Sequence, residues 1–350
     1  MKTSFVSSQG IADVSRSQLL RMQAELTKLE KEVVSGRVAD AGVALGGQTG
    51  QSVSLERDVD RLEGIIDSNS AAASRLSATQ AGLESLQDLS QKFLSTMTGA
   101  TSGTVAPAIS LKEAETLITS MTGVLNSNFN GENLFAGVNT DVKPIDDFFA
   151  AGSPARTAME TAFQTYFTFP VTDPAAAGIS KTQMTDFLTN VIEPQFTGTD
   201  WQTNWSNASD ETITARITLT DTATVSVSAN IDGVRMLALA GAAITTFIGA
   251  QLSDGARDAL VGFATSKTGQ ATADLARVQA QTGLVEQRVA SASDRLQMQI
   301  DIFKGKISDL VEIDPYEAST RVSSLLSQIE TAYTLTSRLR QLSLINYLPT

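Results

Sequence analysis

Apolar residues recur at alternating steps of three and four positions in two long stretches of the chain, one in each half of the sequence. A repeat near 3.5 residues keeps one stripe of a helix facing a partner helix over many turns, so both stretches are predicted to be long helices. In the C-terminal half, the stripe contains Leu275, Val278, Thr282, Val285, Val289, Ala292, Leu296, Phe303 and Leu310. In the N-terminal half, it contains Leu55, Val59, Leu62, Ile66, Ala73, Leu76, Leu83, Leu94 and Met97. Because neither stripe can bury itself, the two helices are expected to pack on each other or on another copy of the chain.

Two further helices are predicted outside this pair, near the two ends of the chain. Residues 8–35 and the residues after Pro315 each carry an apolar stripe of their own. We expect these stripes to form a subunit interface, with Leu19, Met22, Leu26, Leu29 and Val33 on one helix and Val322, Leu325, Ile329, Tyr333 and Leu339 on the other. A lone helical pair is marginal in water, so these ends are expected to be mobile in the free subunit and to order against neighbouring copies.

The breaks in the helical pattern are marked by glycine and proline. Gly36 is a typical helix end, and Pro315 interrupts the C-terminal pattern. The glycine-rich residues 37–50 are expected to be an irregular linker.

The middle of the chain has a different character. Residues 138–232 contain both tryptophans and five of the eight prolines, and helical periodicity there is short and broken. Residues 212–219 and 222–229 are rich in Thr, Val and Ile with near-alternation, which predicts the two strands of a hairpin. Residues 236–253 carry no charge but include threonines and Gln251, which favours a buried packing helix over a membrane span.

These patterns predict a mainly α protein: a long antiparallel helical bundle or coiled coil from both termini, with a central mixed α/β insertion domain. We expect three parts. Residues 1–40 and 312–350 form a terminal helical assembly domain, residues 41–138 and 235–311 a helical rod domain, and residues 139–234 an insertion domain.

Composition argues against several functional classes. The formal net charge is −12, and there is no cluster of Lys and Arg for binding nucleic-acid phosphates. The chain has neither Cys nor His, so it lacks disulfides, the usual zinc ligands and the commonest catalytic base. Asp146 and Asp147 are adjacent on a predicted turn and do not converge on one point. We therefore expect no catalytic, cofactor-binding or metal-binding residues, and neither enzyme activity nor membrane insertion.

One segment carries a family motif. Residues 125–137 read Leu-Asn-Ser-Asn-Phe-Asn-Gly-Glu-Asn-Leu-Phe-Ala-Gly, in which Asn130 and Gly131 are followed by Leu134, Phe135, Ala136 and Gly137. The segment resembles the Asn-Gly turn of the bacterial flagellin family. Its ending is more similar to the hook-associated members at the hook–filament junction than to flagellin itself. Residues 35–37, Ser-Gly-Arg, are similar to the family's turn after the first helix, and residues 342–348, Leu-Ser-Leu-Ile-Asn-Tyr-Leu, resemble the end of those junction proteins.

The resemblance covers residues 1–138 and 235–350 and implies that residues 139–234 are a variable, surface-exposed insertion domain. It implies a structural subunit of the bacterial flagellum that forms the junction between hook and filament by helix–helix packing between copies. The implied location is extracellular, reached through the flagellar type III export apparatus without a cleaved signal peptide. The implied partners are other copies of the chain in a ring or helical assembly, an adjacent hook-associated protein, flagellin, and an export chaperone that masks the C-terminal helix.

Two alternatives stay open from the sequence. The first is flagellin, the bulk subunit of the filament. The second is a secreted coiled-coil adhesin or effector whose insertion binds a ligand.

Overall fold

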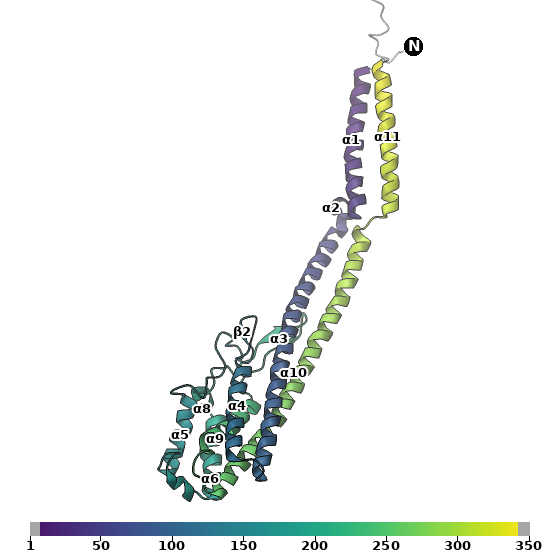
Figure 1. The fold of residues 1–350 in the computed structure, drawn as a ribbon. Helices are drawn as coiled ribbons and strands as arrows, with labels where there is room; N and C mark the ends of the chain where they lie inside the picture. The colour runs from purple at the N-terminus through teal and green to yellow at the C-terminus, as the bar shows by residue number, and fades with distance from the viewer. Residues whose placement is uncertain (1–7, 342–350) are drawn as a thin grey trace, which may run out of the picture. The chain divides into compact units, whose positions relative to one another are not determined.

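The computed structural model describes residues 8–341, and the side chains of residue 10 and residues 13–338 (Figure 1). The helices are α1 (Ser8–Ser35), α2 (Ala41–Leu45), α3 (Thr49–Thr101), α4 (Pro107–Leu125), α5 (Pro154–Phe167), α6 (Lys181–Phe187), α7 (Glu193–Thr197), α8 (Asp200–Asn204), α9 (Asp232–Phe247), α10 (Asp254–Val311) and α11 (Pro315–Gln341). Shorter helical turns are η1 (Gly46–Gln48), η2 (Pro174–Gly178) and η3 (Leu188–Ile192). Two antiparallel hairpins pair β1 (Asn128–Phe129) with β2 (Glu132–Asn133), and β3 (Thr214–Arg216) with β4 (Thr222–Thr224). The predicted mainly α fold class is confirmed.

The chain divides into two compact units, each described by itself below. The terminal unit contains residues 1–63 and 297–350, and the central unit contains residues 64–296. The expected division into three domains, at residues 40, 138, 234 and 311, stays a prediction.

In the terminal unit, α1 packs along α11 (Figure 1). The start of α3 and the end of α10 contribute Val59, Leu62, Ile307 and Val311, all buried. Polar groups also join these two segments, because Lys304 Nζ lies 2.7 Å from Glu63 Oε1.

The expected irregular linker at residues 37–50 is wrong for most of its length, because it contains α2 and η1. The reason is local capping. The carboxylate of Asp40 accepts a hydrogen bond from the backbone N–H of Val43 at 3.1 Å, which satisfies one free donor at the start of α2. The hydroxyl of Thr49 donates to the carbonyl of Gly46 at 2.8 Å, where η1 meets α3.

In the central unit, α3 and α10 run antiparallel, as hydrogen bonds between polar seam residues show. Ser90 Oγ lies 2.7 Å from Thr272 Oγ1, and further along Asn69 Nδ2 donates to Ser293 Oγ at 3.1 Å. Positions that rise along α3 therefore meet positions that fall along α10. These buried polar groups define the register, since a shifted pairing would leave them without partners.

The apolar stripe of α10 departs from the predicted one toward its C-terminal end. Ile300 and Ile307 are buried there, whereas the predicted Phe303 and Leu310 are only half-buried. A straight helix has 3.6 residues per turn, so its inward face drifts away from a strict seven-residue repeat.

The main core of the central unit forms where α9 packs against α4. Gly241 of α9 lies so close to α4 that an added Cβ would be 2.9 Å from Ile118 Cδ1. The helix is buried on nearly every side, which explains why residues 236–253 carry no charge. Within the described residues 8–341, no helix has the length and apolar content that crossing a membrane requires.

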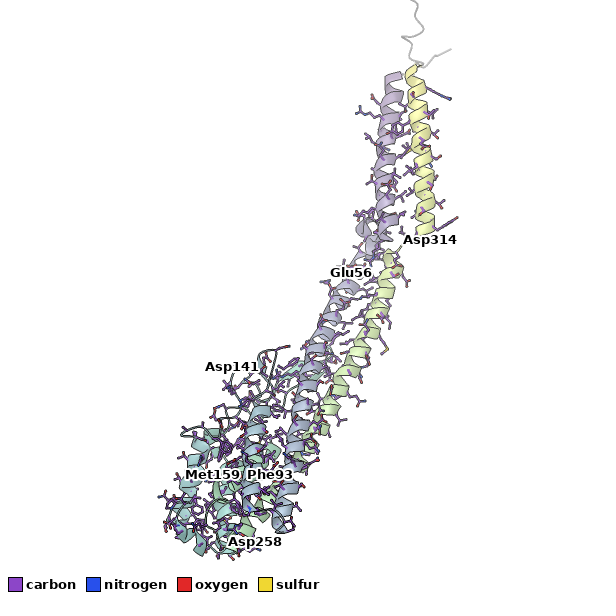
Figure 2. All side chains as sticks on the ribbon, in the orientation of Figure 1. Glu56, Phe93, Asp141, Met159, Asp258 and Asp314 are labelled. Carbon is purple, nitrogen blue, oxygen red and sulfur yellow. The ribbon has the colours of Figure 1, made fainter. Side chains whose placement is uncertain are left out.

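Residues 138–231 share this core, and their aromatic rings fill much of it. The ring of Phe163 in α5 stacks on Phe247 of α9 at 5.5 Å and meets Phe187 of α6 edge-on at 5.6 Å. Phe93 of α3 and Met159 of α5 are also fully buried in it (Figure 2). The insertion is therefore packed against the helices rather than tethered to them.

The β3–β4 hairpin confirms the predicted pair of strands, but both strands are shorter than expected. The N–H of Val225 still donates to Ile213 O at 2.8 Å, but from Ser228 onward the backbone finds partners outside the hairpin. The N–H of Ala229 donates to Phe135 O at 2.7 Å, and Ser228 forms an isolated bridge with Ala136. Sequence periodicity cannot reveal this exchange of partners, because alternating residues suit either pairing.

Gly137 lies where the backbone after β2 comes close to the backbone of residues 209–211. Its φ is +65°, and an added Cβ would lie 2.5 Å from the carbonyl oxygen of Glu211 and still closer to that of Ser209. These oxygens belong to backbone and cannot swing away. Glycine is thus required here both for conformation and for space.

We expect Gly137→Ala to lower the free energy of unfolding by about 2–4 kcal/mol, from the left-handed backbone and the clash together. Gly152→Ala is the matched control, because Gly152 has a φ of +77° but open space around it. The control should cost only about 1–2 kcal/mol. Urea unfolding of the two variants measures the difference, and equal losses would show that the close approach at Gly137 has no energetic weight.

Candidate functional site

The residues predicted to form a subunit interface lie on α1 and α11. Of these, Leu29 and Ile329 are buried, each with 7% of its surface exposed. Six others are only half-buried: Leu19, Met22, Leu26, Val33, Val322 and Leu325. Tyr333 is 52% exposed, and the side chain of Leu339 lies outside the described residues. The two helices thus bring the predicted stripes together, but cover them incompletely.

A second set of apolar residues on the same helices is exposed. It comprises Val14, Leu20, Val34, Tyr316, Leu326 and Leu335. Val34 and Tyr316 are the extremes, with 88% and 83% of their surfaces exposed. None of these residues is among the stripe residues predicted from the sequence, because that prediction followed a single face of each helix. Large apolar side chains that are exposed along both helices are available for burial against another protein.

In the described part of the chain, one side-chain hydrogen bond joins the two helices. Gln23 Nε2 of α1 donates to the hydroxyl of Tyr333 of α11 at 2.8 Å. Tyr333 therefore keeps its ring at the surface while its hydroxyl ties the pair together. Such a bond adds specificity of register more than stability, because it is open to water.

The start of α11 is capped by its own sequence. The carboxylate of Asp314, labelled in Figure 2, accepts hydrogen bonds from the N–H groups of Tyr316 at 2.8 Å and Glu317 at 3.3 Å. Pro315 occupies the first turn, where a missing N–H costs nothing. Pro315 therefore starts a new helix rather than merely ending the previous one.

The family motif forms the β1–β2 hairpin of the central unit. Asn130 and Gly131 occupy its two-residue turn, and both have positive φ, 53° and 87°. Two positive φ values define the type I′ turn, which suits the twist of a hairpin and favours Asn-Gly. The turn expected from the sequence is therefore present.

The rest of the motif anchors this hairpin. Leu134, Phe135 and Ala136 are buried in the central unit, and the ring of Phe135 fills the space beside Gly82 of α3. Arg75 of α3 donates to the carboxylate of Glu132 at 2.6 Å and to Asn133 O at 3.1 Å. We interpret these motif residues as structural, because each has a packing or hydrogen-bonding partner.

Ionisable groups give no sign of a reactive centre in the described part of the chain. No three acidic residues there gather as a metal ion would require. A hydrogen bond to Asp186 raises the pKa of Tyr166, and one to Glu63 raises the pKa of Lys304, so each side chain is held in its ordinary protonated form. Asp147 accepts a hydrogen bond from the N–H of Phe149 at 2.9 Å, as a turn residue does.

Comparison with known proteins identifies both ends of the chain. Residues 6–140 match the family model of the bacterial flagellin N-terminal helical region, and residues 265–348 match that of the bacterial flagellin C-terminal helical region. No curated protein matches the chain. Among solved structures, 31 chains match. One is described as "Structure of putative flagellar hook-associated protein from Vibrio parahaemolyticus", with a TM-score of 0.52 and 9% identity over 75% of this chain and 97% of that one.

The pairing of α1 with α11 is expected to be marginal, because only two stripe residues are buried. Ile329→Asp removes apolar burial worth about 1.5–3 kcal/mol and adds a charge at the contact. We expect trypsin to cleave the free subunit at Lys28 and Lys31 several-fold faster in this variant, while circular dichroism shows most of the helix retained.

Thr331→Asp is the control, because it places the same charge on an exposed position of the same helix. It should be cleaved like the wild type. Complete resistance of all three proteins would contradict both the marginal pairing and the expected mobility of the ends.

Proposed function

The chain belongs to the bacterial flagellin family, and from this premise we propose that it forms the junction between the flagellar hook and the filament. Proteins of this family are structural subunits of the flagellum, an extracellular appendage. The family is not one of enzymes. The finer role at the junction is the proposal.

The observation that supports assembly is that apolar side chains of α1 and α11 are incompletely buried in the single chain. Leu26 and Leu325 are half-buried in the single chain, and Leu20 and Leu335 are largely exposed. Neighbouring copies would cover these side chains. Each large apolar side chain taken fully out of water contributes about 1.5–3 kcal/mol. A ring or helical array of copies is therefore the state in which this unit is expected to be most stable.

Two observations support a junction role rather than a role as bulk filament subunit. The motif ends in Leu134, Phe135, Ala136 and Gly137, the form more similar to hook-associated proteins. A similar fold also occurs in a protein described as hook-associated. The alternative, flagellin itself, is supported by the two family models that match the chain. Abundance separates them, since flagellin dominates a preparation of sheared filaments and a junction protein is scarce in it.

In this proposal, each part of the chain occupies a different layer of the assembly. Residues 1–40 and 312–350 would form the inner tube, residues 41–138 and 235–311 the surrounding wall, and residues 139–234 the outer surface. Partners would be further copies, an adjacent hook-associated protein and flagellin. Before export through the type III apparatus, a cytoplasmic chaperone would cover the apolar residues of α11.

Deleting the gene tests the role directly. We expect electron microscopy to show hooks without filaments, and filament protein to accumulate in the medium. If the chain were flagellin, that released protein would be missing instead. If it were an adhesin or effector, filaments and swimming would be normal.

Leu326→Asp tests the interface between copies. Leu326 is 43% exposed on α11, so the charge harms the single chain little but would be buried between copies. We expect filament attachment and swimming to be lost. Leu219→Asp is the control, because Leu219 is similarly exposed, at 40%, in the central unit. Normal swimming with Leu326→Asp would count against the proposed interface.

A further inference from the structure

The two breaks that separate the terminal helices from the rest of the terminal unit lie directly against each other. Residues 36–40 follow α1, and residues 312–314 separate α10 from α11. Arg37 forms an isolated antiparallel bridge with Glu312. Two backbone hydrogen bonds flank the bridge: Val38 N–H donates to Val311 O at 2.9 Å, and Ile313 N–H donates to Gly36 O at 3.1 Å. We call this pair of hydrogen bonds the latch.

Each helix end is formed by local signals, but the latch is not local. The N–H of Gly36 closes the last turn of α1 on Glu32 O at 2.8 Å, and Asp314 caps α11. The carbonyl of Val311 is one of the last in α10 and has no partner within its helix. Val38, from the opposite end of the sequence, supplies that partner. Each break therefore supplies a backbone N–H to a carbonyl group of the other break.

The surroundings hold the latch in place. The carboxylate of Glu32 accepts a hydrogen bond from the N–H of Ala39 at 2.9 Å, which turns the chain back after α1. Val311 and Ala318, on either side of the C-terminal break, are buried, with 4% and 5% of their surfaces exposed. The latch is partly shielded from water, since Gly36, Val38 and Ile313 are half-buried.

We propose that the latch couples the ordering of α1 to that of α11, so that the two terminal helices behave as one piece. Without it, each helix would be joined to the rest of the unit only by its own connecting segment. The two helices could then order separately, because few apolar side chains are buried between them. With it, the end of α1 and the start of α11 are held at a common point and in one register. A neighbouring copy then meets two helices that order together.

Proline substitution tests the coupling in the free subunit. Val38→Pro removes the N–H that Val311 accepts, whereas the control Val38→Ala keeps it. We expect hydrogen exchange in Val38→Pro to be about fivefold faster at the Ile313 amide and along residues 319–337 of α11, the size of effect that one net hydrogen bond implies. The proline lies near α1, so an effect on α11 reports coupling. Amides of α9 should stay protected in both variants and show that the central unit is folded.

Equal exchange along α11 in Val38→Pro and Val38→Ala would overturn the proposal. Because this measurement uses the free subunit, it does not depend on the proposed role in the flagellum.

A disulfide tests whether the latch stays closed on assembly. The Arg37–Glu312 pair lies between its flanking hydrogen bonds, a geometry with Cα atoms about 4.5 Å apart that a disulfide can span. The chain has no cysteine, so Arg37→Cys combined with Glu312→Cys introduces a thiol pair without competitors. We expect the free subunit to cross-link readily, and the oxidised and reduced forms to assemble equally.

If only the reduced form assembled, the latch would have to open on assembly, and the proposal that it stays closed would be wrong. This arm rests on the proposed function. If neither the reduced form nor the wild type assembled, the result would count against that function and leave the exchange measurement standing.

Discussion

A helix can turn only part of its circumference toward one partner, and this limit governs the terminal unit. The stripes of α1 and α11 face each other, yet only Leu29 and Ile329 are buried by the contact. Side chains such as Leu20 and Val34 lie on other parts of the helix surface and find no cover in the described chain. A pair of helices with apolar residues on more than one face is stable only when further helices surround it.

The central unit solves the same problem within one chain. There α3 and α10 are joined by α4 and α9 and by the aromatic residues of the insertion, so that side chains such as Phe93 and Met159 are fully buried. Buried polar pairs, including Ser90 with Thr272, define how the helices are aligned. This unit buries a large apolar core within one chain. The contrast explains how one subunit can fold by itself and still require copies of itself.

The proposed function rests on this surface. The side chains with shifted pKa values, Tyr166 and Lys304, are held in their ordinary protonated forms by neighbouring carboxylates. A subunit that acts by packing needs helices presented in a constant register. The latch between residues 36–38 and 311–313 supplies that register at the point where α1 ends and α11 begins.

The sequence by itself determined the helices and the family. Periodicity predicted α1, α3, α10 and α11, because one buried stripe leaves a direct record in the spacing of apolar residues. The Asn130-Gly131 turn could be predicted from the sequence because few residue types adopt its backbone conformation.

The tertiary structure alone decided which parts of each surface are covered and which distant segments are bonded. It showed Val34 and Leu335 exposed, paired Ser228 and Ala229 with residues 135–136 instead of with the hairpin, and joined Val38 to Val311. Backbone hydrogen bonds between remote segments do not depend on particular side chains, so no pattern of residue types predicts them.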